Sequence, residues 1–188
     1  MNRMSRAVAM LIAVAMLMAC AHANDPQGPG MILTFVSLKK GVRIDIDTAK
    51  LPDGRAFSHA GTFGPNKRWS NDGKTMGAAP DGRQLPEWVE FEWSERIYGQ
   101  RHTVEEMKAL PRLHQRVVIR ERVPQDVVEE VLQSARDTPR GKLPEKMLWV
   151  YLVWTDDGVK FRWAIKRQPT SPQEQWILRS GGDEIENP

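Results

Sequence analysis

The stretch MLWVYLVWTDDGVKFRWAIK, residues 147–166, decides the fold of this chain. Its first run, MLWVYLVW, is almost entirely apolar, which is typical of a strand that is covered on both faces. Its second run, VKFRWAIK, alternates between apolar and cationic side chains, which is typical of a strand with one buried face. Asp157-Gly158 lies between the two runs, and this dipeptide in that setting indicates a β-hairpin.

A two-residue turn at Asp157-Gly158 predicts the register of this hairpin. It pairs Trp154 with Phe161, Leu152 with Trp163, and Val150 with Ile165. Directly opposed side chains are neighbours in an antiparallel ladder, so we interpret these pairs as sheet core. The opposite face of the hairpin is predicted either to bind a partner or to lie under a helix. It carries Trp149, Tyr151, Val153, Lys160, Arg162 and Lys166.

Four other segments are predicted to be strands, namely residues 31–38, 42–47, 88–93 and 114–123. The third reads WVEFEW, and its Glu90 and Glu92 lie about 7 Å apart on one surface, since they are two residues apart in a strand. Glycosidase carboxylates flank the reacting bond from opposing sides, so this pair is not expected to be catalytic. We interpret it as an ion-pair face that meets Arg120 and Arg122.

One long helix is predicted, over residues 124–136. Pro124 suits the first position of a helix, and the apolar residues that follow form a single stripe. A shorter helix is expected to begin at the capping box formed by Thr103 and Glu106. Strands of period two with one long helix predict an α+β domain, a twisted, mainly antiparallel sheet with one principal amphipathic helix packed on it. The domain is expected to span residues 31–180, before a frayed tail at 181–188.

The first 20 residues have the pattern of a bacterial export signal. Arg3 and Arg6 precede an apolar stretch, residues 7–19, that is shorter than a membrane span. LMAC, residues 17–20, resembles a lipobox in which Cys20 is lipidated, although Met18 is an imperfect lipobox residue. AHA, residues 21–23, is an alternative cleavage site. The first alternative predicts a lipid-anchored protein that faces the periplasm, on the outer membrane, with residues 21–30 as a tether; the second predicts a soluble periplasmic protein.

The charge of the chain does not predict nucleic-acid binding. The formal net charge is +3, and Arg3 and Arg6 of the leader supply +2 of it, which leaves +1 for the rest. A nucleic-acid-binding domain normally carries a clear excess of positive charge. We therefore expect no nucleic-acid partner.

The sequence contains no pattern of residues that points to catalysis. No serine lies in a nucleophile elbow, and Cys20 belongs to the leader. The histidines are scattered, and Asp45 with Asp47 has no third ligand nearby, so these two aspartates are predicted to lie on a solvated face. We expect neither an enzyme nor a metal site nor a cofactor.

A long segment, residues 56–86, is rich in glycine and proline and is predicted to be a loop. It contains Lys67, Arg68 and Trp69, and tryptophan and arginine are common hot spots of protein interfaces. These three residues are the predicted partner-binding site, within the part of the loop at residues 64–83. The alternative is that Trp69 packs on the domain core.

The order of WVEFEW, the capped segment, RVVIRERVP, the acidic helix and the hairpin, together with the lipobox, resembles a family of uncharacterised bacterial lipoproteins, domain of unknown function 2931. The resemblance covers residues 30–167. It implies an immunity-type protein that binds and neutralises a type VI secretion effector of the lipase class in the periplasm. The alternative is a structural envelope lipoprotein that binds a saccharide or an assembly partner, through an exposed ring such as Trp69 or Trp149.

Overall fold

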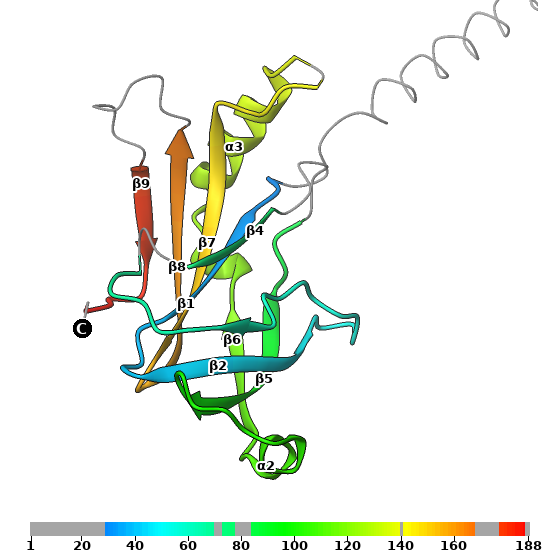
Figure 1. The fold of residues 1–188 in the computed structure, drawn as a ribbon. Coiled ribbons are helices and arrows are strands. Elements are labelled where there is room, and N and C mark those ends of the chain that lie inside the picture. Colours follow the sequence, from blue (N-terminus) through cyan, green and yellow to red (C-terminus); the bar gives the residue numbers. More distant parts are fainter. Residues whose placement is uncertain (1–28, 70–72, 78–83, 140, 168–176, 187–188) are drawn as a thin grey trace, which may run out of the picture.

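The computed structural model describes residues 29–69, 73–77, 84–139, 141–167 and 177–186. Within them the chain forms two β-sheets (Figure 1). The five-stranded sheet has the order β4 (Lys74–Gly77), β1 (Ile32–Ser37), β7 (Lys146–Thr155), β8 (Gly158–Arg167) and β9 (Ile177–Gly182). The four-stranded sheet has the order β3 (Thr62–Phe63), β2 (Val42–Lys50), β5 (Trp88–Ile97) and β6 (Leu113–Val118).

The α+β class and the mainly antiparallel pairing are confirmed, but the predicted single sheet is two sheets. β1 pairs in parallel with β7, and all other neighbours are antiparallel. The short turn after β1 carries the chain from the five-stranded to the four-stranded sheet, where β2 pairs with β5. Residues 56–86, predicted to be a loop, also contribute the short edge strands β3 and β4. Such distant pairings leave no local signal in the sequence.

The main hydrophobic core lies between the two sheets, and Trp154 is at its centre. Its side chain is fully buried. Its ring centroid lies 5.1–6.2 Å from the rings of four aromatic residues, Phe35, Phe63, Phe91 and Trp93. Aromatic rings in such tilted and edge-on arrangements stabilise one another beyond the area that they bury. The hairpin face that was predicted to be core is therefore confirmed as core.

The register of this hairpin differs from the prediction by two residues. Trp154 pairs with Val159, and Leu152 pairs with Phe161. The turn residues are Asp156 and Asp157, neither of which has a positive φ, while Gly158 has φ = 108°. A type I′ turn at Asp157-Gly158 would need a positive φ at the aspartate. Gly158 instead takes the left-handed position directly after the turn, and the shift by two residues keeps every side chain on its predicted face.

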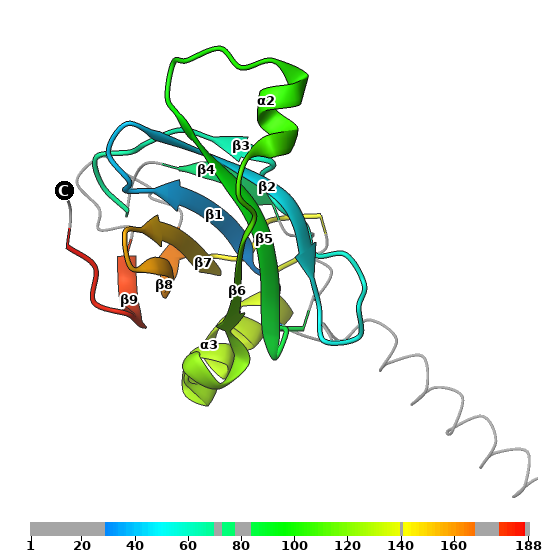
Figure 2. The same cartoon turned by 90° about the horizontal axis from the view of Figure 1, so that it is seen from below.

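Two helices lie at opposite ends of β6 (Figure 2). α3 (Gln125–Arg136) is the predicted principal helix, and its buried Val127 and Val131 join the main core beside β7. α2 (Val104–Ala109) begins at the predicted capping box and has no buried residue. No helix in the described part of the chain has the length and apolar character needed to span a membrane.

The strand predicted at residues 114–123 ends earlier, because β6 stops at Val118 and a 3-10 turn, η1 (Arg120–Arg122), follows. The predicted pairing of Glu90 and Glu92 with Arg120 and Arg122 is therefore wrong. Arg116 in β6 approaches Glu90 at 3.8 Å, and Arg122 binds the carboxylate of Asp183 at 2.5 Å.

The predicted fraying of residues 181–188 is wrong for its first three residues. β9 includes Gly181 and Gly182, which pair with Trp163 and Arg162 of β8. Asp183 accepts a hydrogen bond from the backbone N–H of Phe161 at 2.7 Å, and its own N–H donates to the carbonyl of Phe161 at 2.8 Å. The carboxylate of Asp183 thus continues the ladder where the strand ends.

Candidate functional site

The predicted partner-binding loop is fixed to the sheet on both sides of its basic pair. Before the pair, Pro65 forms a bridge with Ser37, and the backbone N–H of Asn66 donates to the carbonyl of Ser37 at 2.6 Å. After the pair, the ring of Trp69 meets that of Tyr151 edge-on, with centroids 5.2 Å apart and planes at 86°. The loop is therefore held at residues 65–66 and again at residue 69.

Lys67 and Arg68, between these attachments, are exposed, whereas Trp69 is only partly exposed. The guanidinium of Arg162 in β8 lies 4.4 Å from the centre of the Trp69 ring. Such a cation–π contact, together with the Tyr151 contact, makes Trp69 an anchor of the loop. Of the three predicted residues, the structure thus presents the two cations to solvent and packs the tryptophan on the sheet.

Trp69 packs on the outer face of the five-stranded sheet, the face of the hairpin predicted either to bind a partner or to lie under a helix. α3 does not cover this face, since its buried valines belong to the core between the sheets. A second, smaller core lies here, and Trp69, Trp149, Ile177 and Ile185 pack against it. It consists of Val36, Leu38, Tyr151, Val153 and Ala164.

Lys166 lies among the aromatic residues of this face. Its ammonium is 4.2 Å from the centre of the Trp149 ring and 5.3 Å from that of Tyr151. Burial lowers the pKa of Lys166 and raises the pKa of Tyr151. Trp69 and Trp149, the rings considered for stacking on a saccharide, therefore each already carry a cation over one face.

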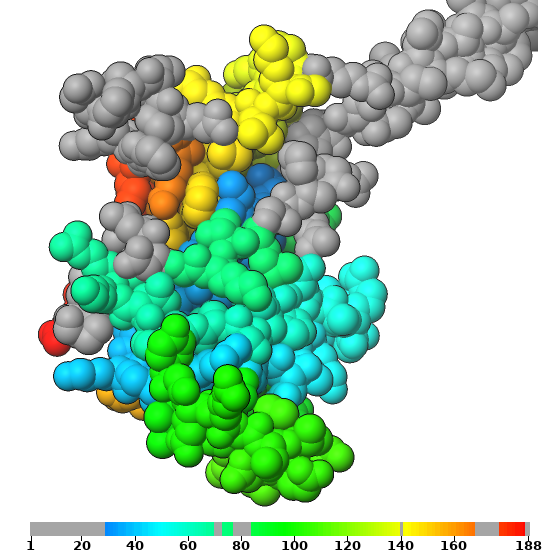
Figure 3. Space-filling model, in the orientation of Figure 1, coloured from blue at the N-terminus to red at the C-terminus, as the bar shows by residue number. Residues whose placement is uncertain are grey.

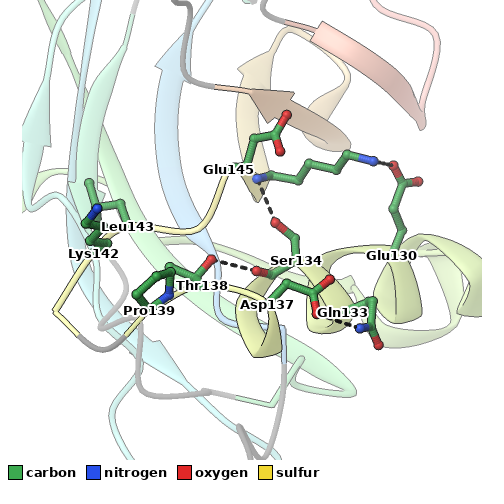
Figure 4. A pocket seen from close by; sticks show the side chains of 10 residues that line it. Glu130, Gln133, Ser134, Asp137, Thr138, Pro139, Lys142, Leu143 and Glu145 are labelled. Carbon is green, nitrogen blue, oxygen red and sulfur yellow. Dashed lines mark hydrogen bonds and ion pairs between the residues drawn. The ribbon is translucent and has the colours of Figure 1, made fainter.

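A hollow of about 540 Å³ lies at the C-terminal end of α3 (Figure 4). Its polar groups bind one another. Lys146 contacts Glu130 at 2.8 Å, and the backbone N–H of Lys146 donates to the hydroxyl of Ser134 at 3.0 Å. The hydroxyl of Thr138 donates to the carbonyl of Ser134 at 2.6 Å. This arrangement closes the end of the helix and contains no nucleophile paired with a base.

A second hollow, of about 390 Å³, lies between α2 and the four-stranded sheet. Asp45 and Asp47 line it, and both carboxylates form ion pairs. Asp45 binds Arg96 through two hydrogen bonds of 2.5 and 2.8 Å, and Asp47 binds Arg112 at 2.5 Å. Burial raises the pKa of Asp45, but the hydrogen bonds from Arg96 and Thr62, together with the charge of Arg96, outweigh this effect and leave the pKa below its usual value. The predicted solvated face is therefore an ion-paired face.

Three histidines, His59, His102 and His114, lie within the described residues, and the charge of Asp47 acts on His59. The Nδ1 atom of His59 accepts a hydrogen bond from the backbone N–H of Gly61 at 3.2 Å, and burial lowers the pKa of His59. Within the described ranges, no three residues among His, Cys, Asp and Glu gather in a way that would hold a metal ion. Cys20, the predicted lipidation site, lies outside the described residues.

Tyr98, which was not among the predicted site residues, lies against the start of the basic loop. A Cβ atom added at Gly64 would be only 2.6 Å from Cε2 of Tyr98, so the ring occupies the space above this glycine. The signal in the sequence is weak but present. Ile97 and Tyr98 are two consecutive large residues after an alternating strand, and an alternating strand cannot bury both.

Comparisons of the chain with protein-family models, with curated proteins and with solved structures found no match. The resemblance to the lipoprotein family, and the function that it implies, stay predictions.

Proposed function

We propose that this chain is an exported, lipid-anchored protein that binds another protein in the periplasm, and that Lys67 and Arg68 belong to the contact. The supporting observation is the exposed basic pair held between two fixed points of a rigid sheet. Binding residues commonly lie on loops that a rigid scaffold positions. A loop already fixed before binding also loses less conformational entropy when the partner binds.

The partner in this proposal is a secreted antibacterial effector, which the chain neutralises by covering its active site. This part of the proposal comes from the resemblance to the lipoprotein family. The pair Lys67 and Arg68 fits the role, since cations at the rim of an interface steer the approach of an acidic partner and select against wrong partners. The saccharide alternative has no matching observation, because Trp69 and Trp149 are packed on the sheet with a cation over each ring.

Deletion of the gene, in cells exposed to siblings that express the effector of the adjacent gene, tests this function. We expect the deletion strain to be killed and the wild-type gene to restore survival. A variant with Lys67→Glu and Arg68→Glu should fail to restore it, although the protein reaches its normal level. Trp69 stays unchanged in this variant, because its removal would disturb the sheet face. Survival of the deletion strain would refute the proposal, and full rescue by the variant would exclude the loop from the contact.

A further inference from the structure

Three segments that are far apart in the sequence meet at the end of the molecule where β1 and β5 finish. The backbone N–H of Tyr98 donates to the carbonyl of Gly41, in the turn between β1 and β2, at 2.8 Å. The ring of Tyr98 lies over Gly64, where the basic loop begins. Figure 3 shows the loop, this turn and the end of β5 side by side on the surface.

The surface that they form carries two exposed apolar residues and three exposed cations. Ile97 is 64% exposed and Tyr98 is 58% exposed, and they are the two most exposed large hydrophobic residues of the described chain. Lys40 in the turn and Lys67 and Arg68 in the loop are also exposed. We call these five residues the basic corner.

The cations of the basic corner have no ion-pair partner in the described part of the chain. Neighbouring Lys39, by contrast, binds Glu95 at 2.5 Å. Glu95 of β5 is therefore engaged by Lys39, and Asp156 and Asp157 lie in the turn that follows β7. Gly158, directly after that turn, packs on Gln115 of β6, whereas Tyr98 packs on Gly64, directly after β3. The basic corner thus presents an exposed aromatic ring and three exposed cations that form no ion pair within the described residues.

The position of the basic corner favours a protein over a lipid surface as its occupant. The described chain begins at residue 29, directly before the first residues of β1, and the corner lies beyond the last residues of β1 (Figure 1). A tether at the N-terminal side would therefore hold the corner on the side of the domain that points away from the membrane. An exposed aromatic residue with a polar rim is also the usual centre of a protein interface.

We propose that the basic corner docks an acidic surface of the partner protein, with Tyr98 at the centre of the contact and Lys40, Lys67 and Arg68 at its rim. This inference rests on the proposed function. It adds two segments to the contact made by the basic loop, namely the turn between β1 and β2 and the end of β5. The partner surface is expected to present carboxylates around an apolar pocket that accepts the Tyr98 ring. Gly64 is then a positioning residue, because only a residue without Cβ leaves the ring in its place.

The first test measures binding of the purified mature protein to the effector encoded by the adjacent gene, by calorimetry at several salt concentrations. Tyr98→Ala should weaken binding at least about 30-fold, which is the size of a hot-spot loss. The variant Lys67→Glu with Arg68→Glu should weaken binding, and this effect should shrink as salt rises. Gly64→Ala should weaken binding with little loss of stability, since the Tyr98 ring is free to move into solvent.

The matched control is Lys142→Glu with Leu143→Ala, a similarly exposed pair of a cation and a large apolar residue beside the hollow of Figure 4. It should bind as the wild type does. If the wild type binds and every corner variant binds equally well, this inference is overturned and the proposed function stands. No binding by the wild type would instead refute the toxin-neutralising function.

The second test does not depend on the identity of the partner. A photo-crosslinking residue replaces Tyr98, or Leu143 as the control, in the full chain expressed in cells that carry the gene naturally. We expect one protein product from position 98 that is absent from position 143 and is lost when Lys67 and Arg68 are reversed in charge. Equal products from both positions, no product, or a product with lipid alone would overturn the inference, as would binding of the corner to vesicles of anionic phospholipid.

Discussion

Gln115 offers the sharpest test of how the two sheets are joined. Its side chain, on β6, makes two hydrogen bonds to the backbone of Val159 at the start of β8. The amide oxygen accepts from the N–H of Val159 at 2.7 Å, and the amide nitrogen donates to the carbonyl at 2.8 Å. Val159 is only 4% exposed. One glutamine therefore satisfies two backbone groups across the junction of the sheets.

The perturbation is Gln115→Ala. It leaves one buried donor and one buried acceptor unpaired, and each such group costs about 1–3 kcal/mol. Gln115 itself is partly exposed, so water reaches part of the vacated space and the total belongs at the lower end, about 2–4 kcal/mol. For a domain of this size each kcal/mol lowers the melting temperature by about 2–4 °C, so we expect a decrease on the order of 10 °C.

The measurement is urea unfolding followed by tryptophan fluorescence. The matched control is Gln133→Ala, because Gln133 bonds Asp137 at 2.9 Å on an exposed helix face and its loss should cost less than about 0.5 kcal/mol. Gln115→Glu adds a check on the mechanism. When the new carboxylate is ionised, its second oxygen repels the Val159 carbonyl. When the carboxyl group is protonated, it can donate a hydrogen bond to that carbonyl again. The loss in unfolding free energy of Gln115→Glu relative to the wild type should therefore shrink as pH falls. A loss below about 0.5 kcal/mol for Gln115→Ala would refute the reasoning.

Three further predictions concern the core, the pH dependence and the location. Trp154→Ala should cost about 3–5 kcal/mol in urea unfolding, because it removes the ring at the centre of the aromatic cluster, and a loss below 1 kcal/mol would contradict this packing. Arg96 holds the pKa of Asp45 below its usual value, so this residue's contribution to stability is complete above the unfolded-state pKa of about 3.9 and is lost as pH falls through the lower folded-state pKa. Asp45→Asn should therefore remove part of the decrease in unfolding free energy at acid pH. Cys20→Ser should move the protein from the membrane fraction to the soluble fraction while export continues; a wild type that is already soluble and begins at Asn24 would favour the alternative cleavage site.

The sequence predicts the elements of this fold better than their partners. The hairpin, α3 and the capped α2 each depend on signals within about 20 residues, such as alternation, an apolar stripe or a capping box, and all three are confirmed. The division into two sheets depends on the parallel pairing of β1 with β7, more than 100 residues later. The register of the hairpin depended on backbone angles at Asp157, and the two aspartates of the turn made the choice of turn type ambiguous.

The sequence predicted the loop that carries the candidate site, but it left open whether Trp69 faces a partner or packs on the sheet. A tryptophan beside an arginine in a loop is typical both of an interface and of a cover for apolar surface. Which of the two roles Trp69 takes depends on whether the neighbouring sheet face is apolar and otherwise exposed. The composition of the loop does not reveal this. Gln115 and Asp183 escaped prediction for a related reason, since a polar side chain that completes a distant backbone ladder has the same local pattern as a solvated one.

The apolar character of β7 on both faces nevertheless contains the deciding information. A strand with apolar side chains on both faces needs a packing partner on each face, and the four-stranded sheet packs on only one of them. The outer face, with Tyr151 and Val153, requires a second cover, and Trp69 supplies part of it. A cover that packs on a rigid sheet is itself fixed, so Lys67 and Arg68 directly before it have a fixed position at the surface. The same packing means that a change at Trp69 alters stability and the placement of the basic pair together, whereas changes at the exposed Lys67 and Arg68 report on binding.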